Sequence, residues 1–303
     1  MKTSNRDWRP SASHEVIRQR AELLSRIRRY FADNGVLEVE TPLLTSSTIP
    51  DPNIPSFSTA VTRAGESCKY LNTSPEFAMK RLLAAGSGPI YQICKAFRQG
   101  EQGKLHNPEF TLLEWYRPGF DHHQLMDEVA MLVAFLAEDY LSFEADERLT
   151  YGDCFQRYLD IDPYVADVSQ LKACVDQQGL GADTGLAEAD RDGWLDLLMS
   201  HSIQPHLGQN RLSFVYDYPS SQAALAKIQP GSPPVAERFE LFMGGVEMAN
   251  GFHELQDAGE QRARFEDELQ RRQENGHEGV AIDEYLLAAL EAGLPKCAGV
   301  ALG

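Results

Sequence analysis

Apolar residues recur at three- and four-residue spacing over residues 14–34, and this pattern predicts a helix with one buried stripe. Gly35 is suited to end the helix, because glycine readily adopts the left-handed conformation found after helix ends. A short strand is expected over residues 36–41, stopped by Pro42, and then a loop over residues 45–58. The buried stripe would consist of Ile17, Ala21, Leu24, Ile27 and Phe31.

Two antiparallel hairpins are the clearest strand signals. The first has strands over residues 90–97 and 109–116 around a polar turn, and the second has strands over 238–243 and 246–255 around Gly244-Gly245. Hairpins mixed with helices, without regular alternation of strand and helix, predict an α+β fold in which helices flank an antiparallel sheet. The other expected elements are helices over residues 76–85, 125–140, 260–273 and 283–292, and a strand over 212–218 within a region of short helices, 143–234.

The composition is that of an ordinary globular protein, with 43% hydrophobic and 24% charged residues among 303. The simplest domain organisation is a tail over residues 1–13 and one domain over residues 14–303. A polar start and the lack of any apolar run of about 20 residues predict a cytoplasmic protein without a membrane partner. The net charge of −17 disfavours indiscriminate binding to nucleic acid phosphates. Five scattered cysteines without a C-x-x-C pair are expected to be reduced and structural.

The strand over residues 109–116 is the first candidate for chemistry. Residues two apart on a strand share a face, so Phe110, Glu114 and Tyr116 point the same way. An extended ligand with a flat ring at one end and a cation at the other would fit this strip. Arg98, on the facing strand, could clamp a phosphate through two parallel hydrogen bonds. From periodicity alone, an ordinary half-buried hairpin with a surface Arg–Glu pair is the commoner interpretation.

The full string over residues 97–116, F-R-x-x-E…H-N-P-E-F-T-x-L-E-x-Y, resembles motif 2 of class II aminoacyl-tRNA synthetases, in the lysyl branch. Other motifs of that family follow in the family's order and cover most of residues 14–303. Residues 26–42 resemble motif 1, 73–76 the substrate loop, 239–255 the paired-carboxylate strand, and 299–303 the opening of motif 3. The resemblance implies the class II catalytic fold, and a homodimer that forms through motif 1.

The same resemblance implies that an amino acid is activated with ATP and Mg²⁺ as an adenylate. Arg98 would hold the α-phosphate, Phe110 would stack on adenine, and Arg98, Glu247 and Glu254 would be catalytic. The implied ATP-binding residues are Arg98, Gln99, Gly100, Glu101, His106, Asn107, Phe110, Glu247 and Met248.

The resemblance also implies a substrate with two amines. Glu76 would bind one amine, and Glu254 with Tyr116 the other. Glu247 and Glu254 would hold the metal; being seven residues apart, they need a bulge, expected at Asn250-Gly251, to reach the same face. The implied substrate-binding residues are Ser74, Pro75, Glu76, Tyr116, Asn250, Glu254, Ala301 and Gly303.

Some features set the sequence apart from lysyl-tRNA synthetases. Those enzymes carry an anticodon-binding domain before motif 1, which begins here about a dozen residues from the start, so a tRNA partner is not expected. The sequence instead resembles the stand-alone elongation factor P β-lysine ligases, which attach (R)-β-lysine to a lysine side chain of elongation factor P. Ala301 stands where lysyl-tRNA synthetases usually carry glycine. Gly100 stands where many class II enzymes have glutamate, a role that Glu101 is expected to take.

Motif 3 of the family continues beyond Gly303 with an Asp-Arg pair whose arginine braces the γ-phosphate. We therefore expect a chain cut within motif 3, and losing one charge-stabilising group commonly costs about 10²–10³ in rate. Two alternatives stay open at this point. One is a lysine-activating paralogue that charges tRNA or a small acceptor. The other is a non-catalytic binding protein, against which the intact Arg98, Phe110, Glu247 and Glu254 count.

Overall fold

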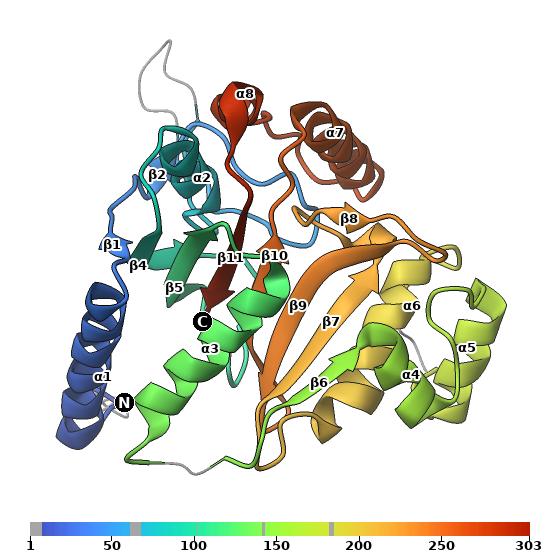
Figure 1. Cartoon of the computed structure of the whole chain (residues 1–303). Coiled ribbons are helices and arrows are strands. Elements are labelled where there is room, and N and C mark those ends of the chain that lie inside the picture. Colours follow the sequence, from blue (N-terminus) through green and yellow to red (C-terminus); the bar gives the residue numbers. More distant parts are fainter. Residues whose placement is uncertain (1–7, 61–67, 101, 141–142, 182–184) are drawn as a thin grey trace, which may run out of the picture.

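One large sheet organises the protein (Figure 1). The computed structural model describes residues 8–60, 68–100, 102–140, 143–181 and 185–303. The strands of the sheet lie in the order β1-β4-β5-β11-β10-β9-β7-β6, with β8 paired to β9, and β2 and β3 form a separate pair. The strands are β1 (Leu37–Glu38), β2 (Leu44–Thr45), β3 (Tyr70–Leu71), β4 (Ile90–Phe97), β5 (Glu109–Pro118), β6 (Glu147–Thr150), β7 (Ser213–Pro219), β8 (Ile228–Gln229), β9 (Val235–Met243), β10 (Val246–His253) and β11 (Cys297–Leu302).

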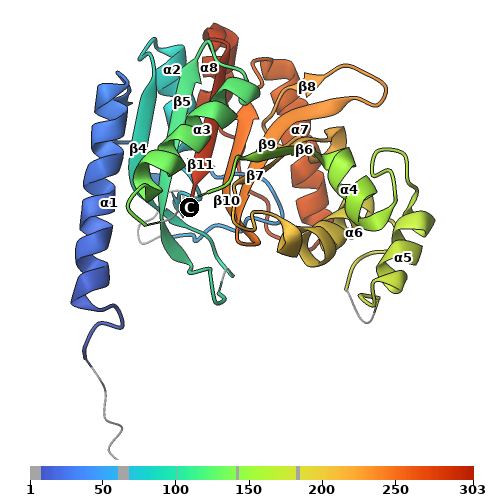
Figure 2. The ribbon, with the colours of Figure 1, turned by 60° about the horizontal axis from the view of Figure 1, so that its bottom comes forward.

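Helices cover both faces of this sheet (Figures 1 and 2). On one face, α1 and α3 bury apolar residues such as Phe31 and Leu125 against Trp115 of β5. On the other face, α2 and α8 pack together near β4 and β11, and α4–α6 pack over β7 and β9. The helices are α1 (His14–Asp33), α2 (Glu76–Ala84), α3 (His122–Ala137), α4 (Tyr151–Leu159), α5 (Val168–Gln177), α6 (Arg191–Leu198), α7 (Ala258–Glu274) and α8 (Glu284–Gly293).

The α+β fold and both hairpins are confirmed. The strand predicted over residues 90–97 is β4, and the Gly-Gly turn joins β9 to β10. The sheet is not antiparallel throughout, because β1 pairs with β4 and β6 pairs with β7 in parallel. Among the described helices, none has the length and apolar character needed to cross a membrane.

Helix α1 differs from its prediction in how much of its apolar stripe is buried. The helix begins after Ser13, whose side chain accepts a hydrogen bond from the Val16 amide, and Gly35 follows it with a φ of 68°. Only the C-terminal part of the stripe, Ile27 and Phe31, is buried. Ile17 is 47% exposed, because the first turns of α1 extend past the sheet (Figure 2). The prediction of one buried stripe along the whole helix was therefore wrong for its first half.

Candidate active site

The strip that the sequence predicts on the second strand of the first hairpin is present on β5. In the β4–β5 pairing, Phe110 lies opposite Ala96 and Glu114 opposite Gln92, so these alternate residues share one face. Glu114 and Tyr116 are each 2% exposed, whereas Phe110 is only half-buried. The strip therefore has a dry end with a phenol and a carboxylate, and a more open end with an aromatic ring.

Small residues on β11 leave room beside the dry end. Gly299 lies opposite Tyr116 and Ala301 opposite Glu114. A Cβ added at Gly299 would lie 2.3 Å from Tyr116 Cε1 and 2.6 Å from Glu254 Oε1. The side chains of Tyr116 and Glu254 come from different segments, and they converge on the space that Gly299 leaves open.

Replacing Gly299 with alanine is expected to destabilise the fold by about 1–3 kcal/mol, because the new methyl group would overpack buried side chains. Gly279→Ala is the matched control, since nothing lies within 4 Å of the Cβ that it adds. Thermal unfolding of both variants measures the difference. Equal stability of the two variants would mean that Tyr116 and Glu254 do not converge as described.

A buried lysine joins two of the predicted substrate residues. Lys80 Nζ lies 2.7 Å from Glu76 Oε1, one helical turn away on α2, and 2.6 Å from Glu254 Oε2. Lys80 and Glu254 are each 1% exposed. Burial opposes the charged form of Lys80, but Glu254 and Glu76 outweigh it and raise the Lys80 pKa. The ammonium of Lys80 therefore stays charged and holds both carboxylates in place.

A third carboxylate lies beside this pair. The Tyr116 hydroxyl donates to Glu114 Oε1 at 2.7 Å. Burial raises the pKa of Glu114 to about 8, and the charges of Glu76 and Glu254 act in the same direction. Burial also raises the pKa of Glu254 to about 7, although Lys80 opposes this.

The dry end therefore has a deficit of positive charge. The carboxylates of Glu76 and Glu254 act electrostatically on that of Glu114 and raise its pKa. Lys80 forms ion pairs with Glu76 and Glu254. Carboxylates with raised pKa values in a dry site gain most from an added ammonium, because the opposite charge restores their ionised form. The geometry suits a ligand that brings amines into the site.

The more open end carries the predicted ATP-binding residues of the β4–β5 turn. The Arg98 guanidinium carbon lies 5.1 Å from the centroid of the Phe110 ring, so cation and ring are adjacent. His106 and Asn107 are exposed on the turn, where a ligand can reach them. Gly100 has a φ of 84°, a conformation that glycine adopts readily and that disfavours a glutamate at this position. Of the other two predicted residues, Gln99 is exposed on this turn and Glu101 lies outside the described residues.

A bulge in β10 lets Glu247 share a face with the substrate residues. The register with β9 shifts between Glu247 and Ala249, so the extra residue is Met248. The bulge expected at Asn250-Gly251 was therefore assigned to the wrong place, since both of these residues pair regularly with β9 and β11. The prediction failed because a glycine in a strand can mark close packing of a neighbouring group as well as a bulge.

Close packing explains Gly251. A Cβ there would lie 2.5 Å from the Phe239 ring. Asn250 accepts a hydrogen bond from Arg238 Nε at 3.3 Å and lies beside Ala301 on β11. Asn250 and Ala301 are therefore neighbours on adjacent strands, and their contact with the substrate stays a prediction.

Glu247 and Glu254, the predicted metal ligands, differ in how available their carboxylates are. Mg²⁺ prefers oxygen ligands and is often held by one or two carboxylates together with substrate phosphates. Glu247 is exposed and lies with Arg238 and Glu240 at a cavity of about 170 Å³, so its carboxylate suits this role. Glu254 is engaged by Lys80, and its part in binding metal stays a prediction.

The predicted substrate loop borders a larger cavity of about 250 Å³. Its lining includes Ser74, Pro75 and Glu76 of this loop and Asp283 at the start of α8. Ser74 Oγ accepts a hydrogen bond from the Glu76 amide at the start of α2. Glu76 thus stands between this cavity and the Lys80 ion pairs.

The predicted residues Met248 and Gly303 meet at the end of the sheet. The Gly303 amide donates to the Met248 carbonyl at 3.1 Å, which extends the pairing of β11 with β10.

Two residues of the site, Lys80 and Glu114, were missing from the residues assigned from the sequence. Lys80 follows Glu76 by four positions on a helix, a spacing that favours an ion pair. Glu114 lies on the predicted strip between Phe110 and Tyr116. Both signals were present, but the contact between Lys80 and Glu254 joins residues too far apart in sequence for spacing to reveal it.

The chain resembles known proteins over nearly its whole length. The family model for tRNA synthetases class II (D, K and N) matches residues 1–303. The Elongation factor P--(R)-beta-lysine ligase of Vibrio cholerae is 51% identical over 303 residues, 99% of this chain and 92% of the relative. Proteins of the same name from Vibrio vulnificus and Proteus mirabilis are each 50% identical, over 98% of this chain and 91% of each relative. The chain therefore belongs to the class II tRNA synthetase family, in which ATP is used.

Proposed function

We propose that this protein activates (R)-β-lysine with ATP and transfers it to a lysine side chain of elongation factor P. The observation that carries the proposal is the group of the buried Glu114 and Glu254 and the half-buried Glu76 around Lys80. This group lies at the closed end of a strip that also carries Arg98 and Phe110. The names of relatives about 50% identical to the chain support this choice of substrate and acceptor.

In the proposed reaction, the substrate carboxylate attacks the α-phosphorus of ATP and pyrophosphate leaves. Arg98 would stabilise the charge on the α-phosphate, and Phe110 would stack on adenine near Asn107. Mg²⁺, held by Glu247 and the phosphates, would neutralise further charge. The amine of the acceptor then attacks the carbonyl carbon, AMP leaves, and an amide remains.

The dry end would select the substrate through its two amines. Glu254 and Tyr116 would bind one ammonium with Glu114, and Glu76 would bind the other. Charge-assisted hydrogen bonds in a dry site discriminate strongly against analogues that lack an amine, because they leave buried groups unpaired. Ala301, between Asn250 and Glu114, adds a methyl group where the resemblance places glycine in lysyl-tRNA synthetases, which suits a substrate with a displaced amine.

The test measures ATP–pyrophosphate exchange with (R)-β-lysine and with L-lysine, followed by transfer to purified elongation factor P. We expect exchange to be strongest with (R)-β-lysine, and elongation factor P to gain the mass of one β-lysyl group. Preference for L-lysine with transfer to tRNA would favour a tRNA-charging paralogue. Absence of exchange with either amino acid would contradict the enzymatic proposal.

We also propose that the protein is a homodimer that forms through α1. Val16, Ile17 and Leu23 are 51%, 47% and 39% exposed on its first turns, an apolar surface that a second copy would cover. A translation factor as acceptor would place the enzyme in the cytoplasm.

Replacing Ile17 with aspartate is expected to weaken the dimer by at least about tenfold, because a charge would be buried within the proposed apolar interface. Gln19→Asp adds the same charge on the same helix and is the control. Sedimentation at several concentrations measures both. Equal association of the two variants, or a wild-type monomer, would exclude α1 as the interface.

A further inference from the structure

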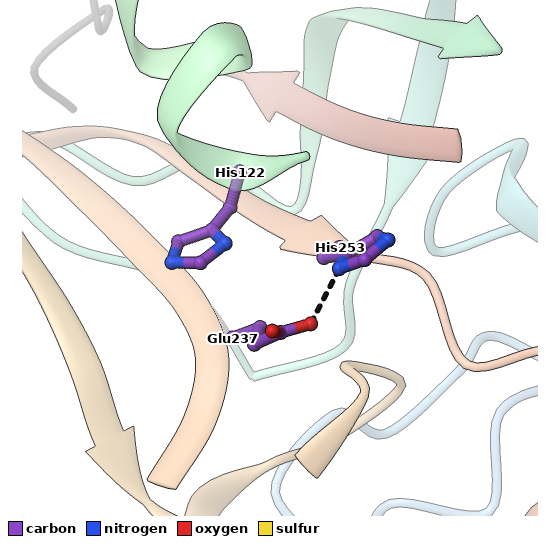
Figure 3. A group of neighbouring side chains, drawn as sticks. All are labelled: His122, Glu237 and His253. Carbon is purple, nitrogen blue, oxygen red and sulfur yellow. Dashed lines mark hydrogen bonds and ion pairs between the residues drawn. The ribbon is translucent and has the colours of Figure 1, made fainter. Parts of the chain in front are cut away.

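Three potential metal ligands meet on the face of the sheet covered by α3, opposite the face that bears the substrate site (Figure 3). His122 is the first residue of α3, Glu237 lies on β9, and His253 ends β10. One ring nitrogen of each histidine and one carboxylate oxygen of Glu237 all lie within 4.8 Å of one another. No motif joins these residues in sequence, so folding alone brings them together.

The cluster is buried and incompletely hydrogen-bonded. His122 and His253 are each 3% exposed. His253 Nδ1 bonds to Glu237 Oε2, the interaction drawn in Figure 3. Neither ring nitrogen of His122 has a hydrogen-bond partner among the described residues, and its Nε2 lies 3.7 Å from Asp217 Oδ1. A buried imidazole without hydrogen bonds is costly, and a bound cation would satisfy it.

Asp217 is a second sign that this site takes a ligand. It has a φ of 57°, a conformation that is uncommon for residues other than glycine, at the point where β7 shifts register against β9. Its Oδ1 is buried and without a hydrogen bond in the described part of the chain. The irregular backbone thus brings a carboxylate to His122, and strained residues of this kind concentrate at functional sites.

The donor set favours zinc over the hard cations. Imidazole nitrogens with carboxylate oxygens suit Zn²⁺, whereas Mg²⁺ and Ca²⁺ prefer oxygen alone. Ligand bonds of about 2.0–2.2 Å place two ligands of a tetrahedral ion roughly 3.4 Å apart, so small movements would close the site. Two neutral imidazoles with Glu237 and Asp217 would balance the charge of a divalent ion.

We propose that His122, Glu237 and His253 bind one Zn²⁺ ion, with Asp217 as the fourth ligand. A closed set of four protein ligands is typical of a structural zinc site, not a catalytic one. The ion would tie the start of α3 to the start of β9 and the end of β10. Since Glu254 directly follows His253, the ion would also fix the backbone that carries one of the substrate carboxylates.

The test is metal content and Zn²⁺ affinity of the protein after treatment with a chelator. Equilibrium dialysis is expected to give about one tightly bound Zn²⁺ per chain, and His122→Gln is expected to weaken binding at least about 100-fold. His123→Gln, an exposed neighbour outside the ligand set, is the control and is expected to change affinity by less than about threefold. Zinc in 100-fold excess over its dissociation constant should raise the wild-type melting temperature by about 5 °C.

Equal Zn²⁺ binding by the two variants, or none by the wild-type protein, would overturn the proposal and leave a buried His–Glu pair. If His122→Gln does not fold, Glu237→Gln replaces it, because glutamine keeps the shape and can still accept from His253. Co²⁺ loaded into the wild-type protein gives an independent measurement. Intense visible absorption bands of tetrahedral Co²⁺ are expected, and the weak bands of octahedral cobalt would exclude a four-ligand site.

Discussion

Replacing Lys80 with methionine is expected to destabilise the protein by about 3–5 kcal/mol, which corresponds to a fall of roughly 10 °C in melting temperature. Methionine fills a similar volume but removes the ammonium that pairs with Glu76 and Glu254. Glu254 would stay buried, and Glu76 half-buried, beside Glu114 without a cation. Breaking a buried ion pair on one side costs far more than the intact pair contributes, because the remaining charge is uncompensated.

The loss of folding stability in Lys80→Met should increase as the pH rises. Without Lys80, the native pKa of Glu254, already raised to about 7 by burial in the wild type, would rise further above that of the unfolded chain, so the native state would bind more protons. Stability of the variant is then greatest near pH 5 and falls as the pH rises toward about 8. Urea unfolding at both values measures this slope.

Lys172→Met is the matched control, since Lys172 is only half-buried and pairs with the exposed Glu188 at the surface. Surface pairs of this kind contribute roughly 0–1 kcal/mol. If Lys80→Met is as stable as Lys172→Met, the buried cluster does not depend on the ammonium, and its assigned role is wrong.

Glu114→Gln is expected to lower kcat/KM for the diamine substrate by about 10²–10³ and to raise stability above neutral pH. Glutamine keeps an acceptor for the Tyr116 hydroxyl but removes the charge that the substrate ammonium would meet. In the wild-type protein the pKa of Glu114 is raised to about 8 by burial. Ionising this group in the folded state is therefore unfavourable, and the variant avoids that cost.

The pH window follows from the raised pKa. Between about pH 4.5 and 8 the unfolded chain loses the Glu114 proton while the folded chain keeps it, so wild-type stability falls as pH rises through this window. One pKa unit corresponds to about 1.4 kcal/mol, so the window is worth a few kcal/mol. In Glu114→Gln the slope should be smaller, and the part that remains comes from Glu254, whose pKa is about 7.

Glu109→Gln tests the same change at an exposed position of the same strand, where the carboxylate pairs with Lys95. It should leave both the activity and the pH slope within about twofold of the wild type. Loss of activity in Glu114→Gln without any gain in stability at high pH would show that Glu114 is already compensated in the folded protein.

Much of the fold could be predicted because its signals are local. The β4–β5 hairpin follows from two apolar runs around a polar turn, and alternation along β5 places Phe110, Glu114 and Tyr116 on one face. Helix ends were also close to their predictions, since caps such as Ser13 act within a few residues.

The parts that were missed depend on tertiary contacts. The bulge at Met248 is set by how β10 aligns with β9, and the nearby Asn250-Gly251 pair gave a stronger local signal at the wrong place. The exposure of Ile17 depends on where the sheet ends beneath α1. In the cluster of His122, Glu237 and His253, the first histidine lies more than a hundred residues before the other two ligands, so no spacing rule could reveal it.

The position of β11 has a consequence for how the protein is made. This strand follows all the other strands in chain order, yet it lies in the middle of the sheet, between β5 and β10. During synthesis on the ribosome, the two halves of the sheet can form hairpins but cannot join until β11 emerges. Such non-local pairing makes folding slow, and the open edges of β5 and β10 would need protection from other chains in the interval. Gly299 and Ala301 also arrive with this strand, so a nascent chain cannot assemble its substrate pocket before translation has passed residue 302.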